Sequence, residues 1–146
     1  MTDRSIPQDK LFTSRLAGIF VDKEKKGWFG RKKIVTVFKL TRDMIYWTGN
    51  PDSPEMIIVS EGFETDGASI PKVFWSVIGS PLLGRYRNAA VLHDYLYATN
   101  LFDKKRCDDL FLEAMGVLGV QLWKRRTMYR AVRMFGGRPY KKGGKQ

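Results

Sequence analysis

The sequence predicts an α+β fold, in which an antiparallel sheet of three to four strands is followed by three to four packed helices. Residues 15–63 are rich in β-branched and aromatic residues between short turn segments. Residues 69–135 instead combine helix caps with apolar residues at helical spacing. The chain has 146 residues, of which 43% are hydrophobic, and this suffices for one domain with its own core.

The expected strands lie in the first half of the chain. Their composition marks residues 16–21, 34–40, 44–47 and 56–60. Turn-forming residues separate these segments. We expect residues 1–10, which are polar, to form a flexible arm, and residues 11–137 to form the domain.

Four helices are expected after the strands. Apolar spacing and caps place them at about residues 69–78, 85–98, 103–118 and 121–135. Ser69 and Asp103 are favourable N-caps, and Pro71 lies in the first turn of its helix. Residues 138–146 contain Pro, Gly and Lys with little to bury, so they predict a flexible basic tail.

The net charge of +11 is unevenly placed. Residues 1–120 carry 17 basic and 15 acidic side chains, whereas residues 121–146 carry nine basic side chains and no acidic one. Such a concentration favours binding to nucleic acid, anionic lipid or an acidic protein; the alternative is a solvated tail without a partner. The candidate partner-binding residues are Lys124, Arg126, Arg130, Arg133, Arg138, Lys141 and Lys142.

A second basic group lies in the first expected hairpin, where it accompanies Trp28 and Phe29. Its members are Lys23, Lys25, Lys26, Arg31, Lys32 and Lys33. Exposed aromatic residues among lysines suit a membrane interface, stacking on single-stranded nucleic acid, or contact with another protein. No recognised nucleic-acid-binding motif is present.

Several classes of protein are excluded by the sequence. No apolar stretch approaches the ~20 residues of a membrane span, and the polar N-terminus lacks the apolar segment of a signal peptide. Cys107 is the single cysteine, which excludes an internal disulfide and a cysteine-ligated zinc site and fits a reducing compartment.

The chemically most suggestive residues lie on the second expected helix. On a helical wheel its inner face contains Tyr86, Ala89, Ala90, His93, Leu96 and Tyr97, with Asp94 at the edge. A buried histidine needs polar partners. If the second and third helices are antiparallel, Asp108 reaches His93, and Tyr97 lies near by.

Two interpretations of this His–Asp pair stay open. In one, Asp108 orients His93 as a general base, and Asp94 helps to hold a hard cation. In the other, His93 is a core residue whose carboxylate partner locks the helix packing.

The segment 65–71 joins the sheet to the helices. It forms either a structural turn with a helix cap, or a loop that directs Asp66 or Ser69 toward His93. Ser69 could then act as a nucleophile, although no Gly-x-Ser-x-Gly elbow surrounds it.

The pattern Ala-Ala-x-x-His-Asp-x-x-Tyr at residues 89–97 resembles the active-site helix of phospholipase A2, particularly its parvoviral form. The resemblance implies that His93 activates water, that Asp94 binds calcium, and that Tyr97 and Asp108 orient the histidine. Calcium is the one cofactor it suggests. The glycine-rich calcium loop of that family has no clear counterpart, because residues 79–84 are short and a poor match.

Segments 63–71, 89–97, 106–114 and 129–136 together resemble a phage and prophage family known as domain of unknown function 1353. This resemblance covers about residues 55–137 and implies a bacterial virus or prophage setting, but no activity. The positions that fit the family pattern are Asp66, His93, Asp94, Tyr97 and Asp108 or Asp109.

Two functional hypotheses follow. The first is an accessory or virion-associated phage protein that docks through its basic surface onto other phage proteins or an anionic surface, such as phospholipid or nucleic acid. It would reside in the host cytoplasm or the virion. The second is a small calcium-dependent ester hydrolase that uses His93 as its base.

Overall fold

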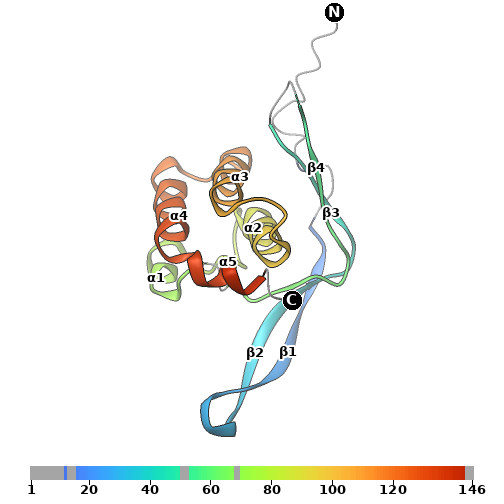
Figure 1. Cartoon of the computed structure of the whole chain (residues 1–146), viewed down its shortest axis with the longest axis vertical. Coiled ribbons are helices and arrows are strands. Elements are labelled where there is room, and N and C mark those ends of the chain that lie inside the picture. The colour runs from blue at the N-terminus through green and yellow to red at the C-terminus, as the bar shows by residue number, and fades with distance from the viewer. Residues whose placement is uncertain (1–11, 13–15, 50–52, 68–69, 144–146) are drawn as a thin grey trace, which may run out of the picture.

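The computed structural model describes residue 12 and residues 16–49, 53–67 and 70–143 (Figure 1). In this part of the chain two antiparallel sheets precede a group of packed helices, so the predicted α+β class is confirmed. The sequence suggested a single sheet, whereas the strands divide into a three-stranded sheet of order β1-β2-β5 and a separate two-stranded sheet of β3 and β4.

The three-stranded sheet is built on a long hairpin. Strand β1 (Gly18–Lys26) pairs along its whole length with β2 (Lys32–Leu40), and the short η2 turn (Trp28–Gly30) joins them. The hairpin extends away from the helices (Figure 1). Strand β5 (Glu64–Thr65) adds to β2 near its end. It has only two residues, which is too short to produce a pattern in the sequence.

The second sheet packs one face on the core. Strand β3 (Met44–Trp47) pairs with β4 (Met56–Val59), and alternate residues of both strands are buried. Tyr46 of β3 is fully buried, and its hydroxyl donates to the carboxylate of Glu113. The same carboxylate accepts a bond of 2.8 Å from the backbone N–H of Gly49. Glu113 therefore fastens this sheet to the helical part of the protein.

The helices lie close to where the sequence predicts them. They are η3 (Lys72–Phe74) with α1 (Trp75–Ile78), α2 (Arg87–Thr99), α3 (Lys104–Val117), α4 (Leu122–Phe135) and α5 (Gly137–Gly143). Helix α2 is central: seven of its residues are buried, and it packs against both α3 and α5. None of the described helices is long and apolar enough to cross a membrane.

Local sequence explains where α2 ends and α3 begins. Asn100 adopts a left-handed conformation with φ of 47°, which ends α2. The side chain of Asp103 accepts a bond of 2.9 Å from the backbone N–H of Arg106, so the predicted N-cap of α3 is confirmed. Ser69, the cap predicted for the first helix, lies outside the described residues, as does the expected arm at residues 1–10.

Part of the expected flexible tail is helical. Gly137–Gly143 form α5, which follows α4 after the single residue Gly136. Tyr140 of α5 packs its ring 5.5 Å from that of Tyr97, and its hydroxyl donates to the Phe102 carbonyl at 3.1 Å. These contacts with α2 and the following loop stabilise a segment that has little helical propensity of its own.

The cap of α3 yields a stability prediction. Asp103→Ala removes the acceptor of the Arg106 N–H, and we expect the free energy of unfolding to fall by about 1 kcal/mol. Urea denaturation measures this change. Asp103→Asn is the matched control, because its side-chain oxygen still caps the helix; an equal loss in both variants would mean that the cap bond is not the cause.

Candidate functional site

Helices α2 and α3 pack as an antiparallel pair, which is the condition on which the expected contact between His93 and Asp108 depended. The ring centroid of Tyr97, near the end of α2, lies 5.9 Å from the ammonium nitrogen of Lys104, at the start of α3. The ring of His93, one turn earlier in α2, stacks on that of Phe111, further along α3, with centroids 4.6 Å apart. Because the contacts run in opposite directions along the two helices, the predicted His–Asp contact becomes possible.

One carboxylate oxygen joins His93 and Tyr97. Nε2 of His93 lies 2.8 Å from Oδ1 of Asp108, and the Tyr97 hydroxyl donates to the same oxygen at 2.5 Å. The side chains of His93 and Asp108 are both 0% exposed. The structure therefore brings together three of the residues that the sequence singled out.

The other oxygen of Asp108 binds two cations. Lys104 Nζ lies 2.8 Å and Arg133 Nη1 lies 2.9 Å from Oδ2. Lys104 also donates to the carbonyl oxygens of Val132 and Arg133, at 2.8 and 3.3 Å, in the last turn of α4. A single carboxylate is thus bonded to side chains of three helices; we call His93, Tyr97, Lys104, Asp108 and Arg133 the Asp108 cluster.

The Asp108 cluster keeps its carboxylate ionised. Burial favours the neutral acid and would raise the pKa of Asp108, but hydrogen bonds from His93, Lys104 and Tyr97 outweigh it and hold that pKa below its ordinary range. An ionised carboxylate only accepts hydrogen bonds, so Nε2 of His93 carries the proton in this contact. Burial, together with Asp108, raises the pKa of Tyr97, which remains a donor.

Gly136 allows the end of α4 to approach this cluster. A Cβ atom at this position would collide with the Tyr97 hydroxyl and with the carbonyl oxygen of Val132. The sequence predicted only that the fourth helix ends at Gly136. A close approach between α2 and α4 leaves no local pattern in the sequence that would reveal it.

Asp94 has a structural partner in the sheet. It is half-buried at the edge of α2 and accepts a hydrogen bond from the hydroxyl of Thr65 in β5. Thr65 Oγ1 in turn accepts from the backbone N–H of Gly67 at 3.1 Å. Asp94 therefore ties α2 to the strand that precedes the helices.

No group of acidic side chains that would form a calcium site accompanies Asp94 in the described part of the chain. Calcium takes six to eight oxygen ligands. Among the described residues no group of three or more His, Cys, Asp or Glu side chains could hold a metal ion. The chemistry available at the Asp108 cluster is that of a hydrogen-bonded imidazole and carboxylate.

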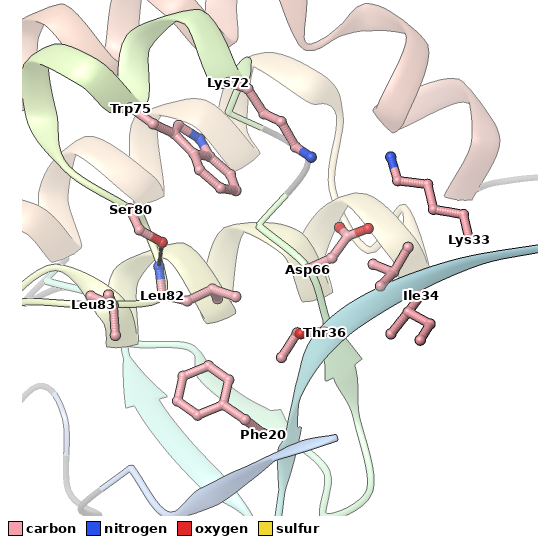
Figure 2. A pocket seen from close by; sticks show the side chains of 11 residues that line it. Phe20, Lys33, Ile34, Thr36, Asp66, Lys72, Trp75, Ser80, Leu82 and Leu83 are labelled. Atoms are coloured by element: carbon pink, nitrogen blue, oxygen red, sulfur yellow. Dashed lines mark hydrogen bonds between the residues drawn. The ribbon is translucent and has the colours of Figure 1, made fainter. Parts of the chain in front are cut away.

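Asp66 lies elsewhere. It lines a pocket of about 320 Å³ between the β1–β2 hairpin and the segment around α1 (Figure 2). Its carboxylate also forms an ion pair of 3.5 Å with Lys25. Phe20 and Trp75 contribute to the apolar part of this pocket. His93 is not among the described residues that line this pocket. Ser69 lies outside the described residues.

Two members of the Asp108 cluster are not among the residues predicted to interact with His93. Lys104 precedes Asp108 by four residues, a spacing that brings side chains together on a helix and could have identified it. Arg133 was assigned to the partner-binding surface alone. Its side chain bonds to Asp108 across 25 residues of sequence, and no local sequence pattern predicts a contact at that separation.

The predicted partner-binding residues are distributed over α4 and α5. Arg126, Arg130, Arg133, Arg138 and Lys141 are exposed. Lys124 is half-buried and lies 5.6 Å from the ring centroid of its neighbour Trp123. The side chain of Lys142 lies outside the described residues.

The match to a family model assigns the chain to a known group. The model of a protein family of unknown function, DUF1353, matches residues 38–132, which include His93, Tyr97 and Asp108. The chain belongs to the DUF1353 family. This region contains α2, α3 and most of α4, whereas β1 and the η2 turn precede it.

Two curated relatives of this DUF1353 protein are uncharacterized proteins of Sinorhizobium fredii. The protein y4jT is 35% identical over 127 residues, which cover 86% of this chain and 34% of the relative. The protein y4iH is 35% identical over 75 residues, which cover 51% of this chain and 31% of the relative. The chain thus spans about a third of the length of each relative. No solved structure matches it.

The charge on Asp108 predicts a pH-dependent stability. Asp108→Asn leaves Lys104 and Arg133 facing an amide, and we expect a loss of about 3 kcal/mol at pH 7. The folded pKa of Asp108 lies below the unfolded value of about 3.9. Its contribution is therefore complete above that value and is lost as the pH falls below it. Urea denaturation between neutral and acidic pH measures both effects.

Asp109→Asn is the matched control for this experiment. Asp109 is the next residue in α3, is half-buried, and binds Lys105 and Tyr129 at 2.6 and 2.7 Å. Because its ion pair is largely solvated, we expect a loss below about 1 kcal/mol. Equal losses for the two aspartates would contradict the central role of Asp108.

Proposed function

We propose that this protein is a non-catalytic accessory component of a phage or prophage that docks onto the acidic surface of a partner protein through the outer face of α4. In this proposal the protein resides in the host cytoplasm or in the virion. The observation that carries it is the arrangement of basic side chains on α4. The buried Asp108 cluster supports that face of α4.

The outer face of α4 is cationic along its length. Arg126, Arg130 and Arg133 follow one another at intervals of four and three residues, so they share one side of the helix, and all three are exposed. No acidic residue occurs between residues 121 and 146. Arginine binds carboxylates through two parallel hydrogen bonds, which favours an acidic protein surface as the partner.

Apolar side chains accompany these arginines. Leu122, Trp123 and Met134 are exposed on the same helix. Binding energy at protein interfaces concentrates in arginine and aromatic residues that lose contact with water. The combination on α4 therefore supports docking to a protein more than a role as a solvated basic helix.

The Asp108 cluster holds the docking face in place. Arg133 binds Asp108, while Lys104 binds both Asp108 and the last carbonyls of α4, so this end of the helix has a fixed position on α3. His93 is fully buried and stacked on Phe111. A general base must reach the proton that it abstracts, so the burial of His93 supports a packing role.

Charge reversal on α4 tests the docking proposal. A fluorescent polyglutamate peptide serves as the acidic probe. We expect Arg126→Glu/Arg130→Glu to weaken its binding by roughly 100-fold, because each reversal replaces an attraction with a repulsion of about 1 kcal/mol or more. Fluorescence anisotropy at increasing salt concentration measures the affinity and its screening.

The matched control reverses two charges on a surface remote from α4. Arg31→Glu/Lys33→Glu changes the net charge by the same amount at the β1–β2 hairpin. We expect a loss of no more than about threefold from the altered net charge. Equal losses in both double variants would show that net charge alone drives the binding, and the docking face on α4 would then be abandoned.

A second candidate is an ester hydrolase, and one observation favours it. His93 and Tyr97 share a single oxygen of Asp108, which is the arrangement that the phospholipase A2 resemblance implies. In this candidate Asp108 and Tyr97 position His93, and its other ring nitrogen takes a proton from water. The water oxygen then attacks the ester carbonyl, and the alcohol leaves with a proton.

Lipid hydrolysis separates the two candidates. We expect no release of fatty acid from phosphatidylglycerol–phosphatidylcholine vesicles, with calcium or with a chelator. We also expect His93→Ala to lower the free energy of unfolding by about 1–3 kcal/mol, since Asp108 loses a buried donor. Release by the wild type that disappears in a still-folded His93→Ala or His93→Gln variant would establish the hydrolase instead.

A further inference from the structure

The tip of the β1–β2 hairpin presents two aromatic side chains to solvent. Trp28 and Phe29 form the η2 turn, and they are 83% and 91% exposed. Their rings contact one another edge-to-face at 5.7 Å. The hairpin carries this turn away from the helices (Figure 1). Two adjacent aromatic rings with this exposure are unusual for a surface that contacts water alone.

The backbone of the turn favours this display. Phe29 has a φ of 60°, in the left-handed region that residues other than glycine rarely adopt. The N–H of Gly27 closes the loop by donating to the carbonyl of Arg31 at 2.6 Å. The turn therefore holds a strained phenylalanine whose ring is not buried against the rest of the chain.

Cations surround the hairpin directly behind the aromatic pair. The strand register places Lys26 opposite Lys32 and Lys25 opposite Lys33. Like charges that face each other across two strands destabilise a hairpin. Lys32 pairs with Glu24 at 3.0 Å and Lys25 with Asp66 at 3.5 Å, whereas Lys26 and Lys33 form no ion pair with any described residue. An anionic surface would relieve this repulsion.

The spacing of these groups matches the depth of a bilayer interface. Strand residues rise about 3.3 Å each, so the lysine pairs lie roughly 3–10 Å behind the aromatic rings. Interfacial apolar groups enter the boundary between headgroups and acyl chains by about 5–10 Å. Tryptophan is enriched at this depth, where lysines contact lipid phosphates.

The arrangement fits a lipid surface better than a nucleic acid. Single-stranded nucleic acid stacks its bases on open aromatic faces that line a basic groove. Here the rings occupy the tip of a hairpin and contact each other. Successive lysine pairs point to opposite faces of the strands, because side chains alternate along a strand. Cations on both faces suit an end-on approach to a plane of phosphates.

We infer that the β1–β2 hairpin is a membrane-binding arm, in which Trp28 and Phe29 enter the interface of an anionic bilayer while Lys25, Lys26, Lys32 and Lys33 bind lipid phosphates. This inference goes beyond the docking proposed for α4, because it uses a different surface and a different partner. The η2 turn also precedes the region that the DUF1353 model matches.

Vesicle binding by the whole chain tests the arm. Vesicles of phosphatidylglycerol and phosphatidylcholine are compared with vesicles of phosphatidylcholine alone by co-sedimentation. We expect binding only to the anionic vesicles, and a loss of at least roughly tenfold in affinity for Trp28→Ala/Phe29→Ala. Brominated lipids should quench the fluorescence of Trp28, and Trp28→Phe should bind with the quenching lost.

Val73→Ala/Val77→Ala is the matched control. It removes exposed apolar side chains from η3 and α1, which are not part of the hairpin tip, and should leave vesicle binding within about twofold of the wild type. Equal losses in the two double variants, or unchanged binding by the hairpin variant, would overturn the inference. So would a hairpin-dependent affinity for oligodeoxythymidine that exceeds the affinity for anionic vesicles. The polyglutamate assay on α4 is independent of each outcome.

Discussion

A charged carboxylate inside the core is the constraint on which the helical part of this protein depends. Removing Asp108 from water is costly, and its charge is tolerated because four donors surround its two oxygens. Those donors come from α2, α3 and α4. Satisfying one carboxylate therefore fixes three helices relative to one another, with a directionality that apolar packing alone does not provide.

Much of this arrangement could be predicted from the sequence because helical periodicity is regular. The wheel placed His93 and Tyr97 on the inner face of α2. Asp108 reaches them because α3 is antiparallel to α2, which the sequence left as a condition. The contribution of Arg133 could not be predicted, since it depends on how α4 crosses α3. The turn at Asp66 left two interpretations open, and the structure places its carboxylate in a pocket beside the β1–β2 hairpin, where it pairs with Lys25.

The same distinction between local and tertiary causes applies to the fold. The strands and α2 to α4 have composition, spacing and caps that predict them, and the structure has them within a few residues. Helix α5 has a Gly-, Pro- and Lys-rich sequence, and its contacts through Tyr140 with α2 and the following loop stabilise it. The division into two sheets depends on which strands pair, and strand propensity alone does not specify pairing.

Arg133 belongs to both the interior and the surface. Its guanidinium binds Asp108, while the residue itself is exposed on the outer face of α4. A ligand carboxylate that captured this guanidinium would compete with Asp108, so the affinity of such a ligand would include the free energy of the internal bond. By linkage, occupancy of the surface and the cohesion of α3 with α4 then change together, and each can be measured through the other.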